Sequence, residues 1–312
     1  MSSSSRSSRS RGTGTDLSGV SSRTRPTTIS SADPAFEQAL IDGNYYPYNR
    51  GPKPNNWEEI REQLARSRPS LSPSQFSDGA FGDFQQRNDE ARTENAVESN
   101  VFTTIRGGPV DQSGQNAKFN HLEPLANGIS AAQPDYYNGS RPAELHSDVR
   151  NDLGRYIIPY NDTSRPMLPN HFTELKGPDG KASEMKRQIT YDLGGGARGM
   201  LEMQSYGRDG YAYDGNAYTL GATYHSGTGS LQMYTMHPTE PAQPGGNPQY
   251  HTTQVRNFAM SDSAETFREG ATWFRNSMEL AKEFRDKAIA QANEVAIARC
   301  GEMFEASADE AF

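Results

Sequence analysis

The segment LPNHFTELKG, residues 168–177, predicts a β-strand that ends at a turn of sequence Gly-Pro-Asp-Gly. Glu174 and Lys176 are two positions apart, so a strand presents both side chains on one face of its sheet. The residues that follow, 183–207, predict a helix with a capping-type start. Three glycines at 194–196 weaken this helix on propensity alone, and a helix that keeps such residues usually meets another backbone or a ligand. A strand, a turn and a helix in this order indicate an α/β fold.

The C-terminal part of the chain adds a hairpin and a long helix. Residues 217–225 (AYTLGATYH) and 230–238 (SLQMYTMHP) flank the turn SGTG, which is the clearest hairpin signal in the sequence. Residues 250–260 are expected to add one edge strand. Residues 263–303 predict a single amphipathic helix that packs over the sheet. The apolar stripe of this helix consists of Phe267, Phe274, Met278 and Ala281.

The N-terminal part is expected to be mostly helical, with one further hairpin. Helical periodicity occurs at residues 34–64 (two short helices), 76–106 (one or two helices) and 143–158. Glu94 lies two turns before Val101, so it projects from nearly the same face as the apolar residues of its helix. Residues 119–139 contain short semi-apolar runs around Asn-Gly, which favour two strands that meet at a turn.

Composition divides the chain into four regions. The 312 residues are 33% hydrophobic and have a mean hydropathy of −0.86, so they can bury one core but carry more polar sequence than it needs. Residues 1–32, a mixture of Ser, Thr and Arg, are expected to be a disordered tail. We expect short helices and an irregular linker at residues 33–75, the main domain at residues 76–300, and an acidic tail at residues 301–312.

Charge and cysteine content restrict the location and partners of the protein. The absence of a long apolar run or an apolar signal segment excludes a membrane partner and favours an intracellular protein of the nucleus or cytoplasm. Cys300 is the only cysteine, so no internal disulfide forms, and it is expected to be an inert thiol on a helix. A formal charge of −8 argues against constitutive nucleic-acid binding, because that binding depends on clustered Lys and Arg. The basic tail suits either simple solvation or contact with nucleic acid.

One constellation of residues suits hydrolysis. Asp135 follows Pro134 at the end of a predicted strand, and Glu174 and Lys176 lie on the next one. Asp135 and Glu174 offer the oxygen ligands that Mg²⁺ prefers, and Lys176 can orient or activate a water and offset charge on a scissile phosphate. Glu94, on its helix face, is placed to complete the site.

With these motifs the chain resembles the PD-(D/E)xK nuclease superfamily, and more narrowly a group of largely uncharacterised fungal nuclease-like proteins. The resemblance covers about residues 57–290 and rests on the segments PKPNNWEEI, PDYYNGSRP, FTELKGPDG, QITYDLGGGARGM and AYTLGATYH. It implies a restriction-endonuclease-like mixed sheet with flanking helices around an αβββαβ core. It also implies catalysis by Asp135, Glu174 and Lys176, a Mg²⁺ or Mn²⁺ ion held by Asp135, Glu174 and Glu94, and Gln188 near the site.

Two assignments within this resemblance have alternatives. Pro169-Asn170, immediately before the second motif, is another candidate for the Pro-Asp position, although its amide would replace a ligand carboxylate; we prefer Asp135. His171 is expected to point away from Glu174 because the two positions have opposite parity in a strand. The candidates for a nucleic-acid edge are Lys186, Arg187, Gln188 and Arg198.

Other chemistries find little support in the sequence. The six histidines lack the spacing of zinc ligands, and the GGGARG run lacks the residues of a phosphate-binding loop, so neither a zinc enzyme nor a nucleotide cofactor is expected. Two functions are the main candidates: a Mg²⁺-dependent nuclease with nucleic acid as its partner, or an inactive nuclease-fold binding module. A third interpretation is an effector or mobile-element accessory protein that is defined by a partner rather than by chemistry. The oligomeric state stays open.

Overall fold

The computed structural model describes residues 28–309 except 48–50, 111 and 163, and side chains only as far as residue 301. Residues 1–27 of the tail predicted at 1–32, and the last three residues, lie outside the described residues. Residues 28–32 are described and pack on the domain, because Ile29 bridges to Ile129 and the carbonyl of Ser31 accepts a hydrogen bond from Arg187, so the tail prediction is wrong for this end. The helices are α1 (Ala35–Asp42), α2 (Trp57–Leu64), α3 (Asp78–Glu90), α4 (Glu94–Ala96), α5 (Thr103–Arg106), α6 (Ser147–Ile157), α7 (Ala182–Ser205) and α8 (Ala264–Asp309). A π-helical segment, Val97–Phe102, joins α4 to α5, and short 3₁₀ turns occupy Pro69–Leu71 and Pro142–Glu144.

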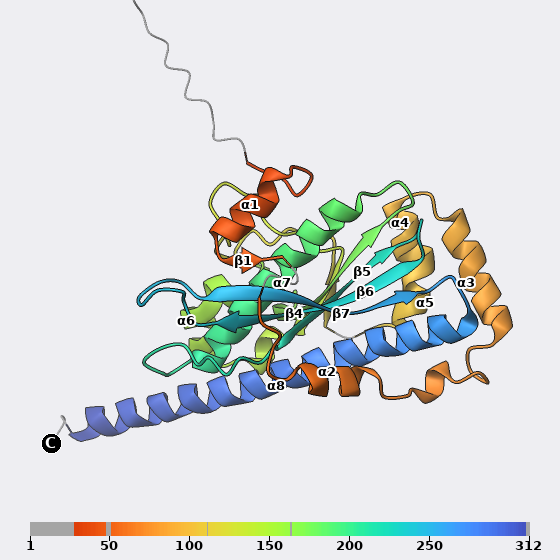
Figure 1. Ribbon diagram of the computed structural model, residues 1–312. Helices are drawn as coiled ribbons and strands as arrows, with labels where there is room; N and C mark the ends of the chain where they lie inside the picture. Colours follow the sequence, from red (N-terminus) through yellow and green to blue (C-terminus); the bar gives the residue numbers. More distant parts are fainter. Residues whose placement is uncertain (1–27, 48–50, 111, 163, 310–312) are drawn as a thin grey trace, which may run out of the picture.

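A seven-stranded mixed sheet forms the centre of the fold, which confirms the α/β class (Figure 1). Its strands are β1 (Tyr45–Tyr46), β2 (Ser113–Gln115), β3 (Tyr136–Ser140), β4 (Met167–Lys176), β5 (Thr219–His225), β6 (Ser230–Thr239) and β7 (Gln249–Ala259). They are arranged in the order β1-β7-β6-β5-β4-β3-β2. Pairs β4–β5 and β1–β7 are parallel and the other pairs are antiparallel. Strand β4, the predicted strand with Glu174 and Lys176, thus lies well inside the sheet.

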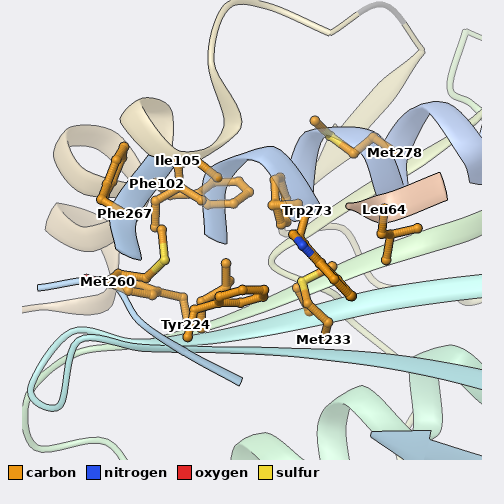
Figure 2. Close-up of a cluster of buried hydrophobic side chains, with 14 of the residues drawn as sticks. Leu64, Phe102, Ile105, Tyr224, Met233, Met260, Phe267, Trp273 and Met278 are labelled. Carbon is orange, nitrogen blue, oxygen red and sulfur yellow. The ribbon is translucent and has the colours of Figure 1, made fainter. Parts of the chain in front are cut away.

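Helices cover both faces of the sheet (Figure 1). Helix α8 and the α2–α5 region pack on one face, where Trp273 of α8 and Tyr224 and Met233 of the sheet belong to one hydrophobic cluster (Figure 2). Helices α7 and α1 pack on the other face. The predicted stripe of α8 is buried at every position named for it, as expected for a helix that covers a sheet. Among the described residues no helix has both the length and the apolar character needed to cross a membrane.

Several local predictions differ from the structure. No hairpin forms around Asn127-Gly128; instead Ile129 makes an isolated bridge with Ile29, and the strand begins only at Tyr136. That strand pairs with β2 and β4, so long-range pairing outweighs the local turn signal. Strand β7 is not an edge strand, because the two-residue strand β1 pairs along its outer side. Helix α8 continues to Asp309, into the segment expected to be an acidic tail.

Gly196 allows α7 to approach β4 closely. A Cβ atom at position 196 would lie 2.6 Å from Cε2 of Phe172 and 3.0 Å from the carbonyl oxygen of Pro169, whereas nothing lies within 4 Å of one at position 195. Gly196→Ala is therefore expected to lower the free energy of unfolding by about 1–3 kcal/mol through overpacking. Gly195→Ala should raise it by up to about 1 kcal/mol, because alanine favours helix. Urea denaturation measures the free energy of unfolding of both variants. Equal changes in the two variants would contradict the close approach of α7 to β4 at Gly196.

Candidate functional site

The predicted residues of the two strand motifs meet at the carboxyl end of β4. Tyr136 pairs with Thr173 in the antiparallel register of β3 and β4, so one further step places Asp135 opposite Glu174. The Oδ2 atom of Asp135 accepts a 2.7 Å hydrogen bond from the backbone N–H of Leu175, which fixes this carboxylate against β4. Asp135 therefore precedes β3 rather than ending a strand, but it still reaches Glu174.

Helix α7 adds two side chains above the same end of β4. Gln188 and Asp192 are four residues apart, so they project from one face of α7, and both line a pocket with Asp135, Glu174 and Lys176. Gln188 was expected near the site from the sequence, whereas Asp192 was missed. The signal was available in principle, since Asp192 follows Gln188 by one helical turn, but only the packing of α7 on β4 shows which face of the helix meets the strand.

Glu94 joins the site from the opposite side. The hydroxyl of Thr93 caps α4 by accepting a hydrogen bond from the backbone N–H of Ala96, and Glu94 is the first residue of that helix. Its Oε1 atom lies 3.1 Å from Nζ of Lys176. The lysine side chain is only 6% exposed and that of Glu94 is 48% exposed, so the ion pair runs from the interior to the rim.

Together these residues form an acidic pocket of about 350 Å³. Four carboxylates, one just before β3 and one each on β4, α4 and α7, surround one buried lysine, and the exposed Lys118 and Asn116 lie at the rim. We call this the acidic pocket; its carboxylates are Glu94, Asp135, Glu174 and Asp192.

Burial and mutual repulsion control the ionisation of the pocket. Burial raises the pKa of Asp192 from 3.8 to about 7 and that of Asp135 to about 6. It also raises the pKa of Glu174 well above its ordinary value, and the charges of Asp135 and Asp192 raise it further. Burial acts to lower the pKa of Lys176, but the neighbouring carboxylates outweigh it, so the net pKa is raised and this lysine is a cation.

Unsatisfied oxygens indicate what the pocket could hold. Glu174 Oε2, Gln188 Oε1 and Asp192 Oδ2 are buried and accept no N–H or hydroxyl hydrogen bond within the described part of the chain. The carboxyl groups of Glu174 and Asp192 can hydrogen-bond to each other when one carries a proton. A cation would satisfy the same oxygens without that proton, and oxygen donors of this kind fit Mg²⁺ or Mn²⁺.

The carboxylates of the acidic pocket are not drawn tightly together. Within the described residues, the one group of three or more metal-ligating side chains whose donor atoms all lie within 4.8 Å of one another is His146, Asp148 and Cys300, elsewhere on the molecule. The pocket residues would therefore have to rotate or draw closer to share one ion.

The predicted nucleic-acid edge is largely engaged inside the protein. Arg187 is buried and donates to the backbone carbonyls of Ser31 and Ala32. Arg198 is buried as well and donates to the carbonyls of Glu123 and Pro124. Lys186 is half-buried on the same helix as Gln188. A role for these four residues in nucleic-acid contact stays a prediction.

The alternatives near β4 are resolved by what the side chains contact. Asn170 donates to the carbonyls of Tyr218 and Ala281 and accepts from Arg285, so it faces α8 and lies outside the acidic pocket. His171 also faces α8, where its Nε2 atom lies 2.8 Å from the hydroxyl of Ser277, which confirms that it points away from Glu174. Of the two candidates for the Pro-Asp position, Asp135 reaches the acidic pocket and Asn170 does not.

Comparison of the chain with protein-family models, with curated proteins and with solved structures finds no match. The mixed α/β fold rests on the structure itself, and the resemblance to nucleases stays a prediction from the sequence motifs.

Proposed function

We propose that the chain is a divalent-cation-dependent nuclease with a restriction-endonuclease-like core, which hydrolyses phosphodiester bonds of nucleic acid in the acidic pocket. The observation that supports this most strongly is the convergence of Asp135, Glu174 and Lys176 with two further carboxylates. These residues come from segments far apart in the sequence, and packing alone would not favour four acids around one lysine. Their repulsion and unsatisfied oxygens are the features expected of a site built for a cation.

Each residue has a separate role in the proposed reaction. Asp135 and Glu174 would hold the ion, which when bound supplies Lewis-acid polarisation of the phosphate, and Glu94 would hold Lys176 in place. The raised pKa of Lys176 makes it a poor general base, so its charge would offset the negative charge that develops on the phosphate oxygens. Asp192, with a pKa of about 7, is well matched to accept the proton that the attacking water releases.

The rim suggests how the substrate approaches. Lys118 and Asn116 line the opening and can contact phosphate and sugar, whereas Arg187 and Arg198 are occupied with backbone carbonyls. A nucleic-acid strand would therefore meet the pocket from the side of residues 116–118.

One observation favours the second candidate, a nuclease-fold module that binds without cleaving. A tight metal site has its ligand atoms close together before the ion binds, whereas no three carboxylates of the acidic pocket are grouped in that way in the described structure. In that case the buried acids would be neutralised by protons and by Lys176 rather than by an ion.

Calorimetric titration of Mg²⁺ and Mn²⁺ together with a plasmid-nicking assay separates the two functions. We expect the wild type to bind the ion and to nick supercoiled DNA, and Glu174→Gln to lose both activities because it removes a ligand charge. Glu184→Gln, on α7 and outside the pocket, is the matched control and should behave as wild type. Absence of ion binding by the wild type would exclude the enzyme and leave the binding module.

A further inference from the structure

A second group of metal-ligating side chains lies where α6 begins and α8 passes beneath it. The Nδ1 atom of His146 is 3.8 Å from Oδ2 of Asp148, and Sγ of Cys300 is 3.4 Å from the same oxygen. All three donors lie within 4.8 Å of one another, and all three residues are half-buried. None of them lines the acidic pocket.

The surrounding structure holds these donors in place. The backbone N–H of His146 donates 2.7 Å to Oδ1 of Asn293 on α8, and Nδ2 of Asn293 donates 2.8 Å to the carbonyl of Glu144. Cys300 follows Asn293 by two helical turns, so it lies on the same face of α8. His146 is the N-cap residue of α6: its Nδ1 atom accepts a 3.3 Å hydrogen bond from the backbone N–H of Asp148 in the first turn, and Nδ1 would exchange this bond for the ion. The cluster is therefore fixed from two helices rather than carried by one loop.

The chemistry of the three donors matches zinc. Imidazole, thiolate and carboxylate are the ligands that Zn²⁺ takes, at bond lengths of about 2.0–2.3 Å. Tetrahedral bonds of that length separate the donor atoms by roughly 3.5 Å, close to the 3.4 and 3.8 Å found here. The charges also balance, because one carboxylate and one thiolate neutralise a divalent ion. Cys300 would release its thiol proton to solvent on binding.

We propose that His146, Asp148 and Cys300 bind a Zn²⁺ ion that fastens the C-terminal part of α8 to the start of α6, with the fourth position open to water. The site is independent of the proposed nuclease activity: its nitrogen and sulfur donors select zinc, whereas the oxygen donors of the acidic pocket select Mg²⁺. The sequence gives no spacing signal for this site, because His146 and Cys300 are far apart in the chain and strands β4 to β7 lie between them in the sequence.

Cobalt substitution tests the proposal directly. In a titration of the reduced full-length protein with Co²⁺, a thiolate-to-cobalt absorption band is expected to saturate at one bound Co²⁺ per chain at this site, and Zn²⁺ should abolish the band by displacing that Co²⁺. Cys300→Ala should abolish that band, and His146→Ala should weaken Zn²⁺ binding by about 10-fold or more. Glu174→Gln and His121→Ala should leave the band unchanged, which separates this site from the acidic pocket.

Two results would overturn the proposal. The first is the absence of a thiolate band in the wild type, and the second is Zn²⁺ binding that survives Cys300→Ala at full affinity. Circular dichroism of each variant checks folding, and because Cys300 and His146 contribute from different helices, one folded variant is sufficient to decide. A result against zinc would reduce the cluster to the hydrogen bond between Cys300 and Asp148.

Discussion

Asp192→Asn is expected to make the protein more stable than the wild type at pH 8, by at most roughly 4 kcal/mol, and to abolish any function that needs the charge. The figure follows from the rise in the pKa of Asp192 from 3.8 to about 7, since a tenfold change in proton affinity corresponds to about 1.4 kcal/mol. The folded wild type is destabilised by this amount because an ionised carboxylate at position 192 is buried beside Glu174 and Asp135. Asparagine keeps the size and an oxygen acceptor but carries no charge.

The direction of this effect with pH is fixed by the raised pKa. A carboxyl group whose pKa is higher in the folded state favours folding fully below pH 3.8, and this contribution is lost as the pH rises to about 7. The stability difference between Asp192→Asn and the wild type should therefore be small near pH 4 and largest above pH 7. The difference is the informative quantity, because burial lowers the pKa of His171 to about 3 and that of His237 to about 4, which destabilises both proteins equally in acid.

Denaturation with urea at several pH values, with and without Mg²⁺, measures this. Mg²⁺ should stabilise both proteins above pH 7, but the wild type more, because the variant keeps the ligands Asp135 and Glu174 and lacks the Asp192 charge that the ion offsets; the advantage of the variant should therefore shrink. Asp179→Asn, in the turn after β4 and outside the pocket, is the control and should show no pH-dependent gain. A pH-independent difference for Asp192→Asn would show that the folded state does not disfavour ionisation of this carboxyl group.

The helices and strands of this protein could be predicted where the local sequence pattern favours the same structure as the packing of the fold. The strand at 168–177, the hairpin around SGTG and the helices α7 and α8 all follow from periodicity and turn residues. Of the three glycines at 194–196, Gly196 does mark a close approach to β4. The opposite orientations of Glu174 and His171 follow from strand geometry alone.

The missed features depend on contacts between distant segments. The Asn127-Gly128 signal was overridden because β3 pairs with β2 and β4 instead of folding back on its own neighbours. Asp192 could not be separated from an ordinary helix-surface acid without knowing which face of α7 meets β4. Arg187 and Arg198 resembled surface cations in the sequence, but irregular segments at residues 31–32 and 123–124 offer them carbonyl oxygens. Such segments carry no periodic signal.

Lys176→Met is expected to separate metal binding from catalysis. The variant should cleave DNA about 10²–10³-fold more slowly, the usual cost of removing a preorganised group that stabilises transition-state charge. Its affinity for Mg²⁺ should be unchanged or higher, because the lysine ammonium competes with the ion for Glu174 and Asp135. Lys181→Met removes an exposed lysine at the start of α7 and should leave both measurements unchanged.

This combination distinguishes a catalytic lysine from one that merely neutralises buried acids. If Lys176 only neutralised buried acids, its loss would raise the pKa values of the remaining carboxyl groups and lower the stability, but the Mg²⁺-loaded variant would still cleave at the wild-type rate. If it acts on the phosphate, Mg²⁺ binding persists while cleavage fails. Parallel calorimetry and single-turnover cleavage at pH 8 decide the matter, and retention of full cleavage by Lys176→Met would remove the lysine from the mechanism.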